Sequence, residues 1–494
     1  MTVADGRHFL PELTDPHPRE ADVHARRAEA NPTRRGTAPG VNIAPGSDDD
    51  GWIVPEPVRL ADGTRIQLYK DGEALHAAYD AIKAARHRIC LEVYIFASDD
   101  TGRAFADLLC AKAREGVRVY VIYDSFGSID TDRSMFRRMR QAGVNMQQFH
   151  PIRPWECRYG WRPFNRDHRK LLVIDDHLGG LGGLNVGAQY AGSWIVQDPK
   201  DSCCDFWRDN AIGMVGPSVK LLLRSFANTW RYVQSGGRIR KAELVHNIEL
   251  ADRSARLRAY RRRQARRIRR FRLRLARFRL RHHLPDDGDG HAAASTDSAG
   301  VRLELPHHRA SPLAADFGLV ASVPTASSPL GSMFRKLFRG AQRSIQLTMA
   351  YFAPSDVFIG ELCRAARRGV KVQLMLPAEC DVHLLMVAAR SFYDTLMSAG
   401  VEIFERQGAV LHAKTMVIDG ETTVIGSTNL DYRSIEYNCE LSAILRSREF
   451  GRQMQDLFAN DVCYAKRILP GEWRRRPVRD RVVQWAVQRA RYLL

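Results

Sequence analysis

Apolar residues along the chain recur with two alternating periods, which predicts strands and helices in alternation. Short runs rich in Val, Ile and Leu alternate with stretches whose apolar positions recur every three or four residues. The first series predicts a strand at 89–96, a helix at 102–115, a strand at 117–123, a helix at 132–142 and a strand at 145–149. A second series predicts the same order at 344–352, 356–368, 370–376, 382–399 and 401–405. This alternation is typical of a mixed or parallel sheet covered by helices.

Glycine marks the passage from helix to strand at four of the predicted boundaries. The dipeptide Gly-Val stands at each of them, and the four glycines are Gly116, Gly143, Gly369 and Gly400. Glycine is the usual residue just past a helix end, because it adopts a left-handed backbone conformation without steric cost. The same boundary chemistry in both series indicates an internal duplication.

Six specified positions recur at identical spacing after the two series. Residues 168–185 read HRKLLVIDDHLGGLGGLN and residues 412–429 read HAKTMVIDGETTVIGSTN, and both fit H-x-K-x4-D-x6-G-[GS]-x-N. The matched residues are His168, Lys170, Asp175, Gly182, Gly183 and Asn185 in the first copy, and His412, Lys414, Asp419, Gly426, Ser427 and Asn429 in the second. A recurrence of this kind is very unlikely by chance, so we expect the two copies to share one function.

We therefore expect an α/β protein made of two duplicated domains, each a mixed sheet flanked by helices. The domains should pack as a pseudo-dimer, with one motif from each facing a single active-site cleft. The expected organisation is a disordered segment at 1–50, a first domain at 51–236, an Arg-rich helical insertion with its linker at 237–300, and a second domain at 301–494. Residues 1–50 are rich in Pro, Gly, Asp and Arg without apolar periodicity, which is typical of disorder.

The spacing within each motif predicts where its side chains point. His168 and Lys170 lie two residues apart on a predicted strand, so both side chains should leave the same face, and the second copy has the same spacing. Asp175 lies at an odd offset from His168, so we expect Asp175 and its counterpart Asp419 at a strand end, where they orient neighbouring groups.

The last part of each motif suits contact with a substrate. Gly183 and Ser427 are small, which lets the backbone approach a ligand closely. Asn185 and Asn429 offer amide donors to a phosphoryl oxygen. We assign these four residues to substrate binding.

Two histidines and two lysines, one pair from each copy, suit the attack on a phosphodiester. One neutral imidazole can attack phosphorus and form a phosphohistidine, and the other can protonate the leaving oxygen and later deprotonate the acceptor. The lysines and asparagines stabilise the charge around phosphorus. The sequence contains no convincing carboxylate–histidine metal cluster, so we expect neither a metal nor another cofactor. The predicted catalytic residues are His168, Lys170, Asp175, His412, Lys414 and Asp419.

The formal charge of +19 is concentrated in one segment. Residues 253–281 contain fifteen arginines and no acidic residue, so the rest of the chain carries only about +4, which is 19 minus 15. Apolar residues in this segment recur at helical spacing, and we favour a helix, although 272–281 also alternates like a strand. The linker at 285–300 is polar and rich in small residues. A basic amphipathic stretch also ends the chain at 478–494. Both basic stretches favour an anionic phospholipid surface as the partner.

The rest of the sequence bears on the compartment. The nine cysteines are scattered without a C-x-x-C pair, which fits a reducing compartment. The N-terminus has no apolar signal region, and no apolar run is long enough for a membrane-spanning helix. We expect a cytoplasmic protein that works peripherally on the inner face of the cell membrane.

The duplicated motif resembles that of the phospholipase D superfamily, and the resemblance covers nearly all of the chain from about residue 51. LEVYIFASDDTGRAF (91–105), EGVRVYVIYDSFGS (115–128) and DFWRDNAIGMVGPSV (205–219) resemble bacterial cardiolipin synthases, as does GSTNLDYRSIEYNCE (426–440). The resemblance implies transfer of a phosphatidyl group from one phospholipid, such as phosphatidylglycerol, to a hydroxyl of another through a phosphohistidine. It also implies that His168 is the nucleophile and His412 the acid and base. The chain resembles the members without transmembrane helices.

Other functions remain open from the sequence. A phosphodiesterase or nuclease of the same superfamily would use water as the acceptor, and its basic segment would bind nucleic acid. A lipid-binding scaffold without activity would be expected to have lost one motif, and both motifs are complete. For a transferase, the acceptor can be phosphatidylglycerol, another phospholipid or a small alcohol.

Overall fold

The computed structural model of the protein describes residues 52–152, 165–192, 207–236, 316–322 and 329–490. The chain divides into two compact units, residues 1–239 together with 305–494, and residues 240–304. Every described residue belongs to the first unit. The expected disordered segment at 1–50, the Arg-rich insertion and its linker lie outside the described residues, so what was predicted for them stays a prediction, as do the exact domain boundaries.

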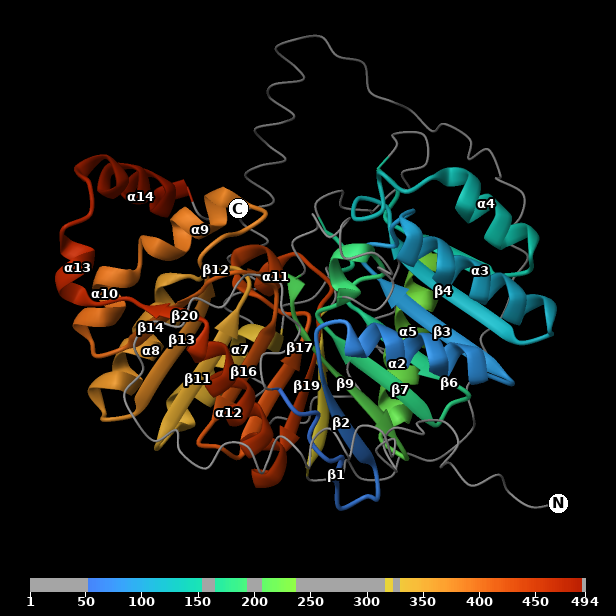
Figure 1. Ribbon diagram of the computed structural model, residues 1–494, viewed down its shortest axis with the longest axis horizontal. Coiled ribbons are helices and arrows are strands. Elements are labelled where there is room, and N and C mark those ends of the chain that lie inside the picture. Colours follow the sequence, from blue (N-terminus) through green and yellow to red (C-terminus); the bar gives the residue numbers. More distant parts are fainter. Residues whose placement is uncertain (1–51, 153–164, 193–206, 237–315, 323–328, 491–494) are drawn as a thin grey trace, which may run out of the picture. The chain divides into compact units, whose positions relative to one another are not determined.

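Two mixed sheets organise the described residues (Figure 1). In spatial order, the first sheet contains β1 (Val58–Arg59), β2 (Arg65–Lys70), β9 (Asn210–Val215), β7 (Leu178–Gly182), β6 (Leu171–Ile174), β3 (Arg88–Val93), β4 (Arg118–Asp124) and β5 (Asn145–Phe149). The second contains β10 (Phe317–Ala321), β19 (Leu441–Arg446), β17 (Thr422–Gly426), β16 (Lys414–Ile418), β11 (Ser344–Met349), β13 (Lys371–Pro377), β14 (Glu402–Arg406) and β20 (Ala465–Arg467).

The two sheets share one strand order, which establishes the duplication in three dimensions. The order β2-β9-β7-β6-β3-β4-β5 corresponds to β10-β19-β17-β16-β11-β13-β14. Strands β3, β4 and β5 are parallel to one another, as are the corresponding strands β11, β13 and β14. The remaining neighbours in each sheet are antiparallel. The sheets differ at their edges, where β1 extends the first and β20 the second. The predicted fold class is confirmed.

Helices cover both faces of each sheet (Figure 1). On the first sheet, α2 (Glu73–Ala84), α3 (Asp100–Arg114) and α4 (Arg133–Gln141) share one apolar core. Helix α5 (Val219–Gln234) covers the other face, where Trp230 packs edge-on against Tyr120 of β4. On the second sheet, α7 (Pro329–Gly340), α8 (Asp356–Arg367), α9 (His383–Arg390) and α10 (Tyr393–Ser398) bury side chains in one core, and α12 (Arg448–Cys463) covers the opposite face.

The glycine boundaries are as predicted, and two predicted elements are divided. Gly116, Gly143, Gly369 and Gly400 all have a positive φ of 88° to 95°, which is the conformation expected just past a helix end. The helix predicted at 382–399 is wrong as a single element, because the chain turns between α9 and α10 to bury Phe392 in the core. The strand predicted at 344–352 ends at Met349, and Phe352–Ala353 form a separate strand, β12, that pairs with β18 (Leu430–Asp431).

Candidate active site

The two His-x-Lys pairs lie at equivalent places, at the start of the central strands β6 and β16. His168 and Lys170 directly precede β6, and His412 directly precedes Ala413 and Lys414 at the start of β16. The prediction that both pairs lie within strands is therefore wrong for His168, Lys170 and His412, and Lys414 alone of the four lies in its strand. The segments that carry the histidines instead contact the backbone of the other repeat. In each pair the lysine amine donates to the backbone carbonyl of the preceding histidine, at 2.8 Å for Lys170, and the expectation of a common face stays a prediction.

Each histidine segment is hydrogen-bonded to the backbone of the other repeat. The amide of His168 donates to the carbonyl of Cys439 at 2.9 Å, and the amide of His412 donates to the carbonyl of Arg208 at 2.8 Å. Next to His412, β15 (Val410–Leu411) pairs in parallel with β8 (Trp207–Arg208). These reciprocal contacts bring the two motifs into one site, as the sequence predicts.

The histidine side chains are also paired across the repeats, each with one carboxylate. Nδ1 of His168 lies 3.1 Å from Oε2 of Glu440 and 3.1 Å from the carbonyl of Ser427. Nδ1 of His412 lies 2.6 Å from Oδ2 of Asp209. Asp209 immediately precedes β9 and Glu440 immediately precedes β19, so the carboxylates occupy equivalent positions. With Nδ1 of both rings engaged, Nε2 is the nitrogen left for chemistry in each.

The small residues of the two motifs make room for these carboxylates. A Cβ atom on Gly183 would lie 2.2 Å from Oδ1 of Asp209, so a side chain there would displace the carboxylate. In the second repeat, Ser427 donates a hydrogen bond of 2.5 Å to Glu440 and accepts one of 3.0 Å from the amide of Leu441. Gly183 and Ser427 therefore contact the partners of the histidines, and their predicted contact with substrate stays a prediction.

Burial depresses the basicity of His168, His412 and both lysines, and repulsion from neighbouring cations adds to this effect at all of them except Lys414. Burial, and then the charge of Lys414, lowers the pKa of Lys170 to about 7. Burial lowers the pKa of Lys414 to about 8, although the negative charges of Asp209 and Glu440 act to raise it. Burial and the lysines also lower the pKa of both histidines, that of His412 well below its ordinary range. Both rings are thus held neutral near pH 7 beside two amines that can still bind protons.

The two carboxylates differ in their ease of ionisation. Burial alone would raise the pKa of Glu440. The imidazole of His168, through its charge when protonated and through its hydrogen bond, acts with Lys170 to outweigh burial and lower that pKa. Burial raises the pKa of Asp209 to about 6, although Lys414 opposes this. Glu440 is therefore the more firmly ionised partner.

Aromatic rings surround both histidines and restrict the access of water. The ring of Tyr94 lies 5.2 Å, centroid to centroid, from His168 and 5.3 Å from Lys170 Nζ. Around His412, Trp207 lies at 4.8 Å, Tyr190 at 5.5 Å and Tyr351 at 6.3 Å. Tyr190 belongs to a short 3-10 turn, Ala188–Tyr190.

The motif asparagines support the segments that carry these aromatic rings. Oδ1 of Asn185 accepts from the amide of Ile95 at 3.0 Å, and its Nδ2 donates to the hydroxyl of Tyr190 at 2.7 Å. Oδ1 of Asn429 accepts from the amide of Tyr351 at 3.2 Å. Both asparagines lie at the site, and their predicted donation to a phosphoryl oxygen stays a prediction.

The structure does not bring Asp175 and Asp419 to the histidines. Each follows the far end of its strand, β6 or β16, in a left-handed conformation with φ of 47° and 56°. The carboxylate of Asp175 accepts from the amides of residues 86–88, and that of Asp419 from the amides of residues 342–344. These aspartates fix the start of β3 and β11, so their place at a strand end was predicted correctly, whereas a catalytic role has no geometric support.

The sequence interpretation missed Asp209 and gave Glu440 no role. Both lie outside the duplicated motif, and their separation from the following strand is the same in both repeats, which is the signal that could have identified them. Arg169 was also missed: its guanidinium donates to Thr229 of α5 and to the carbonyl of Ser322, and thus links the first motif to the second repeat.

Metal-binding clusters and membrane-spanning helices are both absent from the described part of the chain. No group of three or more His, Cys, Asp or Glu side chains there is arranged to hold a metal ion. No helix in these ranges has the length and apolar character needed to cross a bilayer.

The sequence matches known proteins along most of its length. A family model described as "Cardiolipin synthase, PLD-like domain" matches residues 79–193 and again residues 334–462. A probable cardiolipin synthase of Bacillus subtilis is 28% identical over 424 residues, which cover 85% of this chain and 70% of that protein. A cardiolipin synthase of a Geobacillus species is 29% identical over 437 residues, which cover 87% and 72%.

A solved structure shows the same fold. The crystal structure of a phosphatidylserine synthase from Haemophilus influenzae superposes with a TM-score of 0.59. It covers 89% of this chain and 97% of that one at 14% sequence identity, so the likeness concerns the fold alone.

Proposed function

The chain belongs to the cardiolipin synthase type of the phospholipase D superfamily, and we propose that it transfers a phosphatidyl group from one phospholipid to a hydroxyl of another. With phosphatidylglycerol as donor and acceptor, the products are cardiolipin and glycerol. The observation that carries the proposal is the crossed pairing of His168 with Glu440 and of His412 with Asp209, beside two lysines. This arrangement supplies two imidazoles and two cations to one phosphodiester.

The reaction proceeds in two displacements. In the first, Nε2 of His168 forms a bond to phosphorus while the bond to the glycerol oxygen breaks, and His412 gives that oxygen a proton. In the second, His412 takes the proton of the acceptor hydroxyl, whose oxygen bonds to phosphorus while the bond to His168 breaks. The anionic substrate raises the pKa of His412 when it binds, which supplies the proton needed in the first step.

The environment of His168 supports its role as the nucleophile. The firmly ionised Glu440 fixes the proton of His168 on Nδ1 and stabilises the positive charge that the ring gains on attack. Lys170 and Lys414 stabilise the charge on the phosphoryl oxygens. Because these groups supply the cations, we expect the reaction to persist in EDTA.

The partner we propose is an anionic phospholipid surface, which the protein binds peripherally on the inner face of the membrane. Helix α14 (Val478–Ala490) exposes Val478, Val482 and Trp485, with exposed fractions of 71%, 58% and 57%. Arg489 lies over the ring of Trp485 at 3.9 Å, so an aromatic and a cation share one face. Such a helix suits a bilayer interface. The second repeat also contains two short helices, α11 (Tyr432–Glu436) and α13 (Pro470–Arg474).

The proposed membrane surface continues toward the active site. Helix α14 packs against α9 (Figure 1), which exposes Leu384. Asp381, just before α9, accepts a hydrogen bond of 2.7 Å from Tyr351, the residue beside His412. A bilayer in contact with α9 and α14 would therefore lie close to the site that takes its lipid.

One incubation tests the proposal. Purified protein is mixed with phosphatidylglycerol vesicles, with and without phosphatidylethanolamine or glycerol, in EDTA, and the lipid products are identified by mass. Formation of cardiolipin with release of glycerol would support the proposal and would identify phosphatidylglycerol as the acceptor. Phosphatidic acid as the only product would show that water is the acceptor and would favour the phosphodiesterase alternative.

A further inference from the structure

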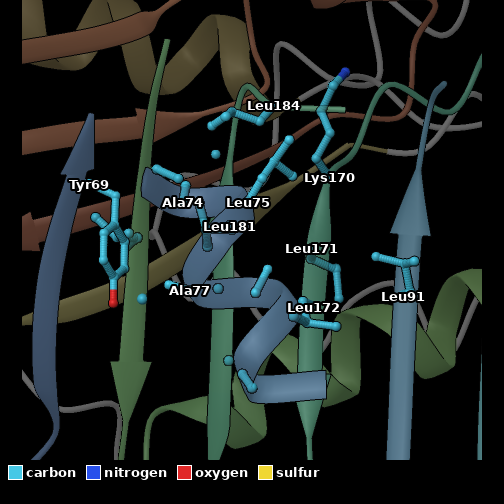
Figure 2. Close-up of a pocket in the computed structure, with 18 of the residues that line it drawn as sticks. Tyr69, Ala74, Leu75, Ala77, Leu91, Lys170, Leu171, Leu172, Leu181 and Leu184 are labelled. Atoms are coloured by element: carbon cyan, nitrogen blue, oxygen red, sulfur yellow. The ribbon is translucent and has the colours of Figure 1, made fainter. Parts of the chain in front are cut away.

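An apolar cavity lies between helix α2 and the first sheet (Figure 2). Its volume is about 100 Å³, and α2 and strands β3, β6, β7 and β9 contribute most of its lining. Tyr69 and Lys170 are the lining residues with polar side chains, and the others are apolar or glycine. The cavity is therefore suited to a hydrocarbon and offers few partners to a water molecule.

Small residues on both walls create this space. On the sheet, Gly180 of β7 and Gly213 of β9 lie directly opposite each other in the antiparallel ladder. On the helix, Ala77 and Ala78 line the cavity. All four residues are only half-buried, although they lie within a layer of helix packed on sheet. These four residues therefore keep surface that no neighbouring side chain covers completely.

The second repeat fills the same space with large side chains. Equivalent positions follow from the shared strands and from the helix that precedes β3 or β11, and they pair Gly180 with Val424, Gly213 with Ile444, Ala77 with Met333, and Ala78 with Phe334. Val424, Met333 and Phe334 are buried in the core of the second repeat. Since the repeats share their fold, the fold itself does not require the cavity. The cavity results from small residues on two facing elements, Ala77 and Ala78 on the helix and Gly180 on the sheet, whereas the ring of Tyr69 lies over Gly213.

One end of the cavity is formed by a residue of the active site. The side chain of Lys170 contributes to the lining, and its Nζ donates to the carbonyl of His168 at 2.8 Å. Figure 2 shows Lys170 and Leu184 near one end, with Leu171 and Leu172 farther along β6. A ligand with its phosphate beside Lys170 could therefore extend an apolar part into the cavity.

We propose that this cavity receives a segment of a fatty acyl chain of the phospholipid bound between His168 and His412. The inference rests on the proposed function, and it assigns one substrate chain to the first repeat. A phospholipid joins an anionic phosphodiester to hydrocarbon chains. The phosphodiester matches the amine of Lys170, and a hydrocarbon chain matches the apolar cavity beside it. An apolar cavity of about 150 Å³ holds a benzene molecule, so this one takes a few carbon atoms rather than a whole chain.

Filling the cavity with the residues of the second repeat tests the proposal. The variant Ala77→Met/Ala78→Phe is compared with wild type on dioctanoyl phosphatidylglycerol and on bis(p-nitrophenyl) phosphate, a phosphodiester without acyl chains. Each buried methylene contributes about fourfold to affinity, so we expect kcat/KM for the lipid to fall by about tenfold or more. Turnover of the chain-free diester should stay close to wild type. Lys83→Met, on the exposed side of α2, is the matched control and should change neither activity.

A second measurement does not depend on how the variant packs. Wild-type protein is irradiated with phosphatidylglycerol that carries a diazirine in one acyl chain, and the modified peptides are identified. Attachment to α2 or β7 supports the proposal, and attachment only elsewhere overturns it. An equal fall in kcat/KM of Ala77→Met/Ala78→Phe on the lipid and on the chain-free diester would also overturn the proposal. The same holds if this variant is more stable than wild type and turns over the lipid at an unchanged rate. If wild type forms no phosphatidyl-transfer product at all, the proposed function fails instead.

Discussion

Nδ1 of His168 lies 3.1 Å from the carboxylate of Glu440, although the two residues are 272 positions apart and belong to different repeats. The reciprocal contact joins the second histidine to Asp209 of the first repeat. Neither repeat alone therefore contains a histidine together with the carboxylate that orients it. The duplication produces a single site because its two halves exchange these carboxylates.

Removing either carboxylate charge should impair catalysis without unfolding the protein. We expect Glu440→Gln and Asp209→Asn each to lower kcat by about 10²–10⁴-fold, because the histidine loses its fixed tautomer. The measurement is phosphatidyl transfer by each variant beside its thermal unfolding. Glu449→Gln, an exposed residue in the first turn of α12, is the control. Near-normal turnover in either site variant would show that the crossed contacts do not serve the chemistry.

The activity should depend on pH in a way that reflects the buried lysines. Their cationic forms are present below the pKa values of about 7 for Lys170 and about 8 for Lys414, and they are lost as the pH rises through those values. We expect kcat/KM, which reports the free enzyme, to fall on the alkaline side in this range. On the acid side, kcat/KM should decline only at a pH below 6.5, the ordinary histidine value, because burial lowers the pKa of His168, whose neutral ring attacks phosphorus. An alkaline decline only near 10.5, the ordinary value for lysine, would contradict this account.

The motif aspartates should matter for stability rather than for turnover. Asp175→Ala and Asp419→Ala each leave three backbone amides without their carboxylate acceptor. We expect each change to reduce the free energy of unfolding by about 1–3 kcal/mol. Chemical denaturation gives this quantity, and kcat is measured under conditions where the variants are folded. A large fall in kcat at unchanged stability would restore the catalytic role.

The Arg-rich segment should contribute to membrane binding. Deletion of residues 253–281 removes fifteen positive charges from between the two repeats. Each basic residue near an anionic surface gains about 1 kcal/mol, and salt screens this attraction. We expect co-sedimentation with phosphatidylglycerol vesicles to weaken strongly on deletion, most clearly at low salt. Tight binding of duplex DNA with no binding to vesicles would instead favour the nuclease alternative.

Much of the fold follows from local sequence, and the parts that do not follow depend on contacts between distant residues. The four Gly-Val boundaries are readable because glycine is required where φ is positive, as at Gly116 and Gly400. The break between α9 and α10 is not readable, because it serves the burial of Phe392 in a core formed by other elements. The histidines and lysines of the site can be predicted because their pattern occurs twice.

The carboxylate partners could not be assigned in the same way. Asp209 lies 203 residues from His412, and neither Asp209 nor Glu440 belongs to the repeated motif. Their pairing depends on the packing of the two repeats, which no local pattern encodes. Conversely, Asp175 belongs to the motif but acts on the backbone near β3, so repetition alone does not separate catalytic from structural residues.

Trapping the covalent intermediate tests the central claim most directly. Wild type, His168→Ala and His412→Ala are mixed with phosphatidylglycerol labelled in its phosphate, denatured in alkaline detergent to preserve phosphohistidine, and digested for mass analysis. The account predicts a phosphatidyl group on His168 in the wild type and none in His168→Ala, with neither variant completing the transfer. A label on another residue, or transfer by His168→Ala at the wild-type rate, would contradict it.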